Sequence, residues 1–177
     1  MAETEFITDR AIYERVLQEQ VPNAKDFVWI GTSDIKDLHV DSKGGMVPFL
    51  KVLSGMIKRQ VSIRLIHAKE PGKNFRDDFD KFPNLIGGME RLLCPRVHFK
   101  CVIIDGRFAY SGSANLTGAG MGAKSPRRRN FESGIITTAP EMIESIMDQF
   151  DAVWMGQFCP DCQRKQYCAD YKDILNP

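Results

Sequence analysis

The sequence has no apolar run long enough to cross a bilayer, because its longest runs, such as residues 102–104, are far too short. Its first five residues are acidic and lack the basic-then-apolar pattern of a secretory signal. Internal repeats, low-complexity segments and a clear linker are also absent from the sequence. With 177 residues the chain can form one domain with a sizeable core, but not two ordinary ones. We therefore expect a soluble, cytoplasmic protein with one domain per chain.

Neither sign of charge dominates, since the formal net charge is only +1. The balance of 43% hydrophobic and 27% charged residues excludes a disordered chain. A neutral total can hide a local patch, and the segment 124–129 contains one, formed by Lys124, Arg127, Arg128 and Arg129. Three interpretations remain open for this run: a solvated loop, a contact across a dimer, or a binding site for phosphate.

Apolar spacing predicts helices that alternate with strands. Helical periodicity is found over residues 8–20, about 46–58 and 141–153. Short apolar or β-branched runs predict strands at 27–30, 61–66, 96–104, 108–110 and 133–138. The segment 69–90 is rich in Pro and Gly and is expected to be a loop with one or more helical turns. This order of elements indicates an α/β sandwich.

One segment combines residues suited to phosphodiester chemistry. On a strand, residues two apart point to the same face, so His98 and Lys100 project together. A cation can hold phosphate oxygens while an imidazole attacks phosphorus or moves a proton. Asp105 follows five residues after Lys100, then a small-residue turn at 112–115 adds backbone and side-chain donors, and Glu132 comes after it.

These residues resemble the signature of the phospholipase D superfamily, which is H-x-K-x4-D, then G-S-x-N, then N-x-E. The resemblance spans roughly residues 8–155 and implies a mixed β-sheet sandwiched by helices. We accordingly predict a phosphodiesterase domain over residues 1–155 and a cysteine-rich, metal-binding tail over residues 156–177.

The resemblance also implies roles for the catalytic residues. His98 would form a covalent phosphohistidine, Lys100 and Asn115 would grip the non-bridging oxygens, and Ser113 would add a phosphate contact. Catalysis of this kind needs no metal.

Two acidic residues complete the implied set. Asp105 would be a structural or electrostatic partner rather than a proton-transfer group. Glu132 would orient His98 and hold its tautomer.

A single motif is only half of an active site in this family, because a second histidine must protonate the leaving oxygen. His39 has no lysine two residues later, and His67 is followed by Lys69 but not by an aspartate at position 74. We therefore expect a homodimer in which two copies of His98 face each other across a two-fold axis. The smallest family members, which are bacterial nucleases and related endonucleases, look like this.

The motif does not determine the substrate. Small size, the absence of a lipid-facing segment and the basic run between Asn115 and Glu132 favour nucleic acid, with Lys124, Arg127, Arg128 and Arg129 as the substrate-binding residues. One alternative is a phospholipase or phosphatidyltransferase acting on lipid phosphodiesters. A second is a non-catalytic nucleic-acid-binding module.

The sequence has five cysteines, and in a reducing compartment these argue against a disulfide framework. Cys159, Cys162 and Cys168 have spacing that can converge on a soft metal, with Cys94 as the fourth ligand. The pattern resembles the 4Fe–4S sites of some DNA-repair glycosylases and iron–sulfur exonucleases, and we favour a structural cluster over zinc. Free surface thiols are the remaining alternative. Cys101 lies in an apolar strand and is interpreted as a core residue.

Overall fold

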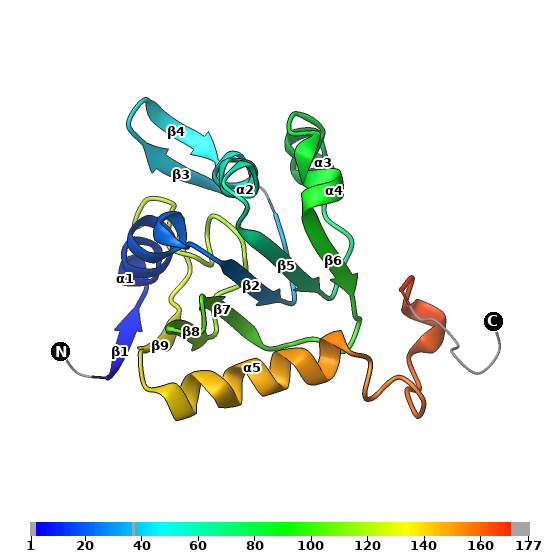
Figure 1. Ribbon diagram of the computed structural model, residues 1–177. Coiled ribbons are helices and arrows are strands. Elements are labelled where there is room, and N and C mark those ends of the chain that lie inside the picture. The colour runs from blue at the N-terminus through cyan, green and yellow to red at the C-terminus, as the bar shows by residue number, and fades with distance from the viewer. Residues whose placement is uncertain (1–2, 37, 171–177) are drawn as a thin grey trace.

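A seven-stranded mixed β-sheet forms the centre of the computed structural model, which describes residues 3–36 and 38–170 (Figure 1). Across the sheet the strands are β1 (Thr4–Thr8), β9 (Ser133–Thr137), β8 (Phe108–Gly112), β7 (Lys100–Ile104), β2 (Phe27–Thr32), β5 (Ser62–His67) and β6 (Met89–Leu93). β2 and β5 are parallel, as are β5 and β6, whereas the other neighbouring strands are antiparallel. A separate hairpin joins β3 (His39–Ser42) to β4 (Gly45–Pro48).

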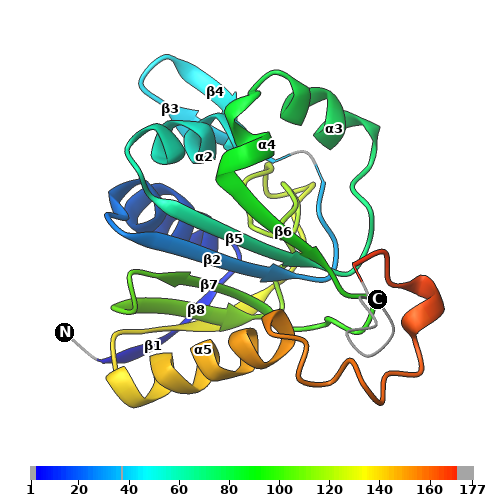
Figure 2. The same cartoon turned by 45° about the vertical axis from the view of Figure 1, so that its right-hand side comes forward.

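Helices cover both faces of this sheet (Figures 1 and 2). The helical segments are α1 (Arg10–Ile12), the π-helix η1 (Tyr13–Gln20), η2 (Val21–Asn23), α2 (Phe49–Lys58), α3 (Lys73–Asp80), α4 (Asn84–Gly88), α5 (Pro140–Trp154) and η3 (Lys165–Tyr167). Side chains from η1, α2, α3 and α4 pack on one face, and α5 packs on the other. The sheet is therefore the middle layer of three.

Strand alternation explains why there are two cores. In β2, Val28 and Ile30 face the η1 side, while Trp29 faces α5. The Trp29 ring stacks on Phe150 of α5 with 5.1 Å between ring centroids. Phe150 is fully buried, which stabilises the fold by about 1.5–3 kcal/mol. α5 is thus anchored to the centre of the sheet.

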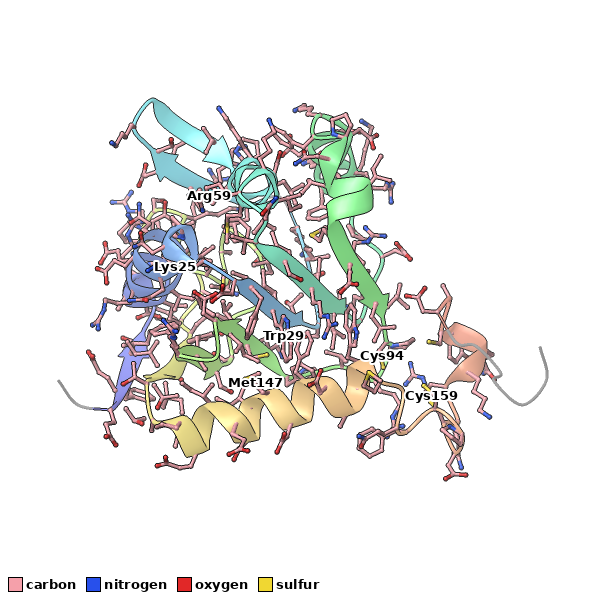
Figure 3. All side chains as sticks on the ribbon, viewed as in Figure 1. Lys25, Trp29, Arg59, Cys94, Met147 and Cys159 are labelled. Atoms are coloured by element: carbon pink, nitrogen blue, oxygen red, sulfur yellow. The ribbon has the colours of Figure 1, made fainter. Side chains whose placement is uncertain are left out.

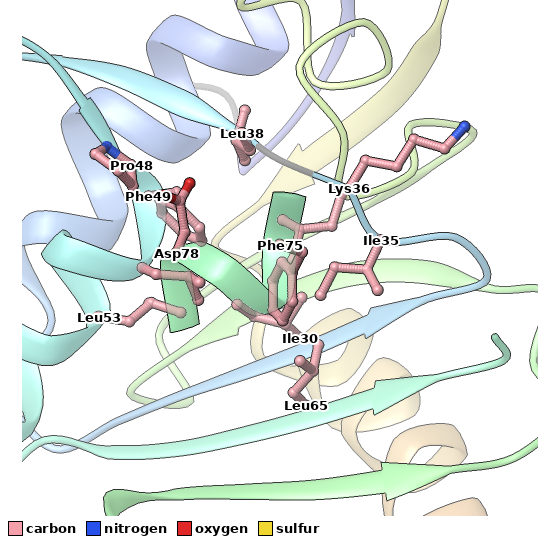
Figure 4. A pocket seen from close by; sticks show the side chains of 12 residues that line it. Ile30, Ile35, Lys36, Leu38, Pro48, Phe49, Leu53, Leu65, Phe75 and Asp78 are labelled. Carbon is pink, nitrogen blue, oxygen red and sulfur yellow. The ribbon is translucent and has the colours of Figure 1, made fainter. Parts of the chain in front are cut away.

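The core on the η1 side is closed. Figure 4 shows a crevice between β2, β5 and α2, lined by apolar side chains such as Ile30, Leu53 and Leu65. Its volume is only about 10 Å³, which is roughly the space of one water molecule. This crevice is too small to hold a substrate.

The sequence predictions missed strands β1 and β3, and the structure differs from them in three further places. Residues 45–48 form β4, so the second helix begins at Phe49 rather than near residue 46. The segment 69–90 contains two helices and the start of the edge strand β6. The strand predicted from residue 96 begins only at Lys100, because Lys100 pairs with the last residue of β8 and residues 97–99 have no ladder partner there.

The described chain ends in a segment without strands. α5 ends at Trp154, close to the predicted domain boundary at 155/156, and that boundary stays a prediction. Residues 171–177 of the predicted tail lie outside the described residues. Within residues 3–36 and 38–170, no helix has both the length and the apolar character needed to cross a membrane.

Candidate active site

His98 and Lys100 meet at the start of β7, on the face of the sheet opposite α5. The Lys100 ammonium donates a hydrogen bond of 2.7 Å to the His98 carbonyl oxygen. Its Nζ also lies 3.3 Å from Nδ1 and 3.4 Å from Nε2 of the His98 ring. The imidazole is exposed, whereas Lys100 is only 6% exposed. The strand end therefore presents a reactive ring to solvent and holds a cation directly behind it.

Burial lowers the pKa of Lys100, and the negative charge of Glu132 partly offsets this effect. A lysine in this environment is less strongly hydrated than one on the surface. It is therefore ready to exchange its few remaining waters for the oxygens of an anionic ligand.

A close packing contact holds the segment before β7 in place. The Phe99 ring lies against the backbone of Gly31 in β2, where a Cβ atom would be only 2.3 Å from Phe99 Cε2. Any side chain at Gly31 would displace the Phe99 ring, which belongs to the residue between His98 and Lys100. Phe99 and Cys101 pack on the α5 side of the sheet.

Asn115 is oriented by the loop that follows β2. Its Oδ1 accepts hydrogen bonds from Ser33 N at 3.2 Å, Ser33 Oγ at 2.8 Å and Asp34 N at 3.1 Å. Because the oxygen is engaged, the amide nitrogen is the donor that remains for a ligand. The Tyr110 hydroxyl accepts the Ala114 N–H at 3.3 Å and helps to shape the same turn. Burial raises the pKa of Tyr110 to about 12.

Glu132 lies beside Ser113 and Asn130. Its carboxylate accepts hydrogen bonds from the Ser113 hydroxyl and, at 3.0 Å, from the Asn130 amide. Glu132 was expected to orient His98. Within the described chain its hydrogen bonds go to Ser113, Asn130 and Asp9 instead, and its charge acts on Lys100.

Asp9 is a positioning residue that the sequence did not reveal. It occupies the N-cap position of α1, but its side chain makes no cap hydrogen bond there and its φ is 48°. Its carboxylate accepts the Glu132 N–H at 2.9 Å, and its own N–H donates to the Glu132 carbonyl at 2.9 Å. Glu132 is therefore held on both sides by one residue from β1's end. No local pattern could identify a pair 123 residues apart.

Asp105 does not join the other predicted catalytic residues. β7 separates it from His98, and it sits at the opposite end of the sheet with a φ of 52°. Its carboxylate accepts N–H bonds from Lys25 at 2.9 Å, Asp26 at 2.9 Å and Phe27 at 2.8 Å. Partial burial opposes ionisation, but these donors outweigh it and lower the pKa of Asp105. Its position is that of a structural residue that holds the start of β2.

The basic run lies in the loop between Asn115 and Glu132. Lys124 lines a cavity of about 220 Å³ together with Lys36, Asn115 and Asn130. Arg127 and Arg128 are exposed, and Arg129 is partly buried. A second cavity is lined by Lys36, Lys69 and Lys73, and it shares Lys36 with the first. Lys36 and the two further lysines were not identified from the sequence, because they are far from the basic run along the chain.

The four cysteines predicted as metal ligands gather at the end of β6. Cys94, Cys159, Cys162 and Cys168 are all free thiols and partly buried. In the part of the chain that the structure describes, no three His, Cys, Asp or Glu side chains already stand at the positions of a metal site. The expected coordination is therefore not preformed. Cys101 is buried in β7, where burial raises its pKa to about 12.

An ammonium held behind an exposed imidazole is suited to gripping a phosphate while the ring attacks phosphorus. The class that this fold and site define is the phosphodiesterases. Residues 17–154 match the family described as "Cardiolipin synthase, PLD-like domain", so the chain belongs to the phospholipase D-like family.

Individual proteins show the same likeness. Mitochondrial cardiolipin hydrolase from Chlamydomonas reinhardtii is 30% identical over 95 residues, which cover 53% of this chain and 40% of that protein. The solved structure of NucT from Helicobacter pylori has a TM-score of 0.58 at 16% identity and covers 84% of this chain and 94% of its own. Nuc from Salmonella typhimurium, a phospholipase D family member, has a TM-score of 0.59 at 16% identity, with 86% and 95% covered. These structures confirm the predicted mixed α/β fold.

Proposed function

We propose that this protein is a homodimeric endonuclease that hydrolyses phosphodiester bonds in nucleic acid through a phosphohistidine on His98. The observation that carries the proposal is the contact of the buried Lys100 ammonium with the exposed His98 ring, in a chain with one such motif. The ammonium and the Asn115 amide would hold the non-bridging oxygens during attack.

The reaction would proceed in two steps. One His98 nitrogen attacks phosphorus and forms an N–P bond, the bond to the leaving oxygen breaks, and that oxygen takes a proton from His98 of the second subunit. This second His98, now neutral, removes a proton from water, whose oxygen attacks phosphorus. The N–P bond then breaks, and the nucleophile is restored.

The structure supports the need for a second chain, because neither other histidine can act as the acid. His67 is 1% exposed, and its Nδ1 contacts the Lys69 carbonyl oxygen at 2.8 Å. Burial lowers its pKa, so it is a poor proton donor at neutral pH. His39 lies in β3, outside the seven-stranded sheet. The second His98 would therefore come from a partner of two-fold symmetry.

Three features support nucleic acid as the substrate. The basic loop emerges between two site residues, Asn115 and Glu132, and Lys124 of that loop lines the cavity beside Asn115. Phe131 is 97% exposed beside that loop, which suits stacking on an unpaired base. By family analogy, most short single-motif members, which the sequence resembles, are nucleases.

Lipid hydrolysis is the second candidate. The matched family description and the curated relative from Chlamydomonas both name cardiolipin. The same His98 chemistry would act on a lipid phosphodiester, and only the binding surface would differ. The exposed charge of Arg127 and Arg128 fits a polyanion better than one headgroup.

The cofactor that we propose has a structural role. Phosphoryl transfer would use only side chains of the two subunits, while a metal held by the tail cysteines, an iron–sulfur cluster in preference to zinc, would support the fold. Brief EDTA treatment should then leave the chemical step intact.

The substrate can be tested with labelled single-stranded DNA, RNA and cardiolipin vesicles in EDTA. We expect the wild type to cleave nucleic acid and His98→Ala to lose at least about 10³-fold in rate. His39→Ala is the matched control and should keep wild-type activity. Turnover of cardiolipin alone would replace the nuclease assignment, and a requirement for added magnesium would contradict the mechanism.

The shared site can be tested with differently tagged subunits. A purified heterodimer with one wild-type and one His98→Ala subunit contains a single His98. That residue can serve as the nucleophile or as the acid, but not as both. The activity of the heterodimer should fall to about 1% of wild type or less, because either loss costs about 10²-fold or more. Retention of half the activity would show that each subunit works alone.

A further inference from the structure

The tail segment, defined here as residues 156–170, has no apolar core of its own. It contains one short 3-10 turn, η3, and its aromatic residues Phe158 and Tyr167 are 55% and 61% exposed. A segment that buries so little apolar surface cannot offset the entropy of holding one conformation, and small units of this kind need a covalent or metal cross-link. Figures 1 and 2 show this segment beyond the end of α5, close to the end of β6.

Two hydrogen bonds connect the far end of the tail segment to β6. The Asp170 carboxylate accepts the Leu93 N–H at 2.6 Å, and the Cys168 thiol donates to the Leu93 carbonyl at 3.3 Å. Cys94 directly follows Leu93, and its N–H donates to the His67 carbonyl at 2.9 Å. Cys168 is thereby brought to a cysteine that the main sheet holds in place.

The other two cysteines approach the same point. Figure 3 shows Cys94 and Cys159 close to each other below the end of β6. The space beside them is a cavity of about 310 Å³, whose lining includes Cys94, Cys159 and Cys162. Three of the four thiols therefore line one open space, and the fourth, Cys168, contacts Leu93, directly before Cys94.

The backbone around Cys159 and Cys162 has the form of a thiolate-binding turn. The Cys162 N–H donates to the Cys159 carbonyl at 3.1 Å, and the Arg164 N–H donates to the Cys162 sulfur at 3.4 Å. Gly156 begins the turn with a φ of 69°. A two-residue spacing within such a turn lets both sulfurs face one ion, and N–H donors to sulfur stabilise the bound thiolate.

We propose that Cys94, Cys159, Cys162 and Cys168 bind one soft metal centre as four thiolates, either a zinc ion or an iron–sulfur cluster. Each thiol releases its proton to solvent as it binds. Rotation of the side chains and a small movement of the tail segment into the cavity would complete the coordination. The centre would join the tail segment to the β6 end.

This centre would also position the nucleophile. Residues 94–99 have no helix or strand structure, and only three residues lie between Cys94 and His98. The Val97 N–H donates to the Cys94 carbonyl at 3.0 Å, and Phe99 lines the same cavity as Cys94. Anchoring Cys94 therefore restrains the segment that carries His98 into the site.

The test measures metal content and does not depend on nuclease activity. The full chain, purified without oxygen, should contain either about one zinc, in a colourless sample, or about four irons with four sulfides, in a brown one. Cys159→Ser and Cys94→Ser should each lose most of this metal, while the matched control Cys101→Ala should keep it. Circular dichroism should show that all variants remain folded.

The outcomes separate the parts of the proposal. Folded wild-type protein that holds no more metal than Cys159→Ser, even after reconstitution with zinc or with iron and sulfide, would overturn the centre. Full metal content in Cys94→Ser would overturn the link to the His98 segment. Hydrogen exchange of residues 94–99 should accelerate several-fold in Cys159→Ser and not in Cys101→Ala, and equal exchange in both would show that the tail does not restrain His98.

Discussion

The Lys100 ammonium lies 3.3 Å from Nδ1 and 3.4 Å from Nε2 of His98, and it also donates a hydrogen bond to the carbonyl oxygen of the same residue. The cation is thus tied to both the backbone and the ring of the proposed nucleophile. A phosphate bound to this cation is necessarily beside the ring. The relationship combines charge neutralisation with orientation in one contact.

Lys100→Met should reveal this coupling, because it approximately keeps the length of the side chain and removes its charge. We expect kcat to fall by about 10²–10³-fold, measured on a fluorogenic phosphodiester, while Lys25→Met at the far end of the sheet stays near wild type (Figure 3). Burial lowers the pKa of Lys100, so activity should decline on the alkaline side before an ordinary lysine titrates at 10.5. A Lys100→Met enzyme as active as Lys25→Met would contradict the assigned role.

Asp9 should act on the reaction only through Glu132. Asp9→Ala removes the acceptor of the Glu132 N–H and should lower kcat about 10-fold or more, because small misplacements of site residues are costly. Asp9→Asn keeps an oxygen acceptor and should restore most of the rate. If both variants behave alike, the negative charge of Asp9 matters rather than its hydrogen bond.

Asp105 should govern stability rather than catalysis. Removing the acceptor of three N–H bonds with Asp105→Ala should cost about 1–3 kcal/mol in the free energy of unfolding. The folded-state pKa is lowered, so this contribution is present above the unfolded pKa near 3.8 and disappears as pH falls through the folded value. Urea unfolding at pH 7 and pH 3 should show a smaller difference between wild type and variant at pH 3.

The basic loop should contribute salt-dependent affinity. Replacing Arg127 and Arg128 by alanine in the inactive His98→Ala background should weaken binding of single-stranded DNA. The slope of log K against log salt should fall by about 0.7 for each phosphate that the variant no longer neutralises. Lys25→Ala removes one charge far from the site and is the matched control. An unchanged slope in the double variant would mean that this loop is solvated or belongs to the dimer interface.

Substitutions of Phe131 can distinguish a role of its ring in base stacking from a role in the dimer interface. Phe131→Ala in the His98→Ala background should weaken single-stranded DNA binding by about 1–3 kcal/mol if the ring stacks on a base. Phe131→Trp should keep the affinity. Analytical ultracentrifugation of the same variants gives the oligomeric state, and dissociation of Phe131→Ala into monomers would place the ring in the subunit interface instead.

Local patterns in the sequence were sufficient for the family, the class of fold and the pairing of His98 with Lys100. Residues 27–30 are all apolar and therefore need cover on both faces of the sheet. His98 and Lys100 are close in the sequence, and their side chains meet even though β7 begins only at Lys100. These properties arise within single elements, so no knowledge of the tertiary structure is needed to predict them.

Only the tertiary structure decided which distant segments meet. Asp9 holds Glu132 across 123 residues, and Asp105 lies away from the site because β7 runs through the sheet between it and His98. β7 itself begins at Lys100 because its partner β8 ends opposite that residue. Strand register and loop paths set such contacts, and they depend on the packing of the whole chain rather than on the spacing of neighbouring residues.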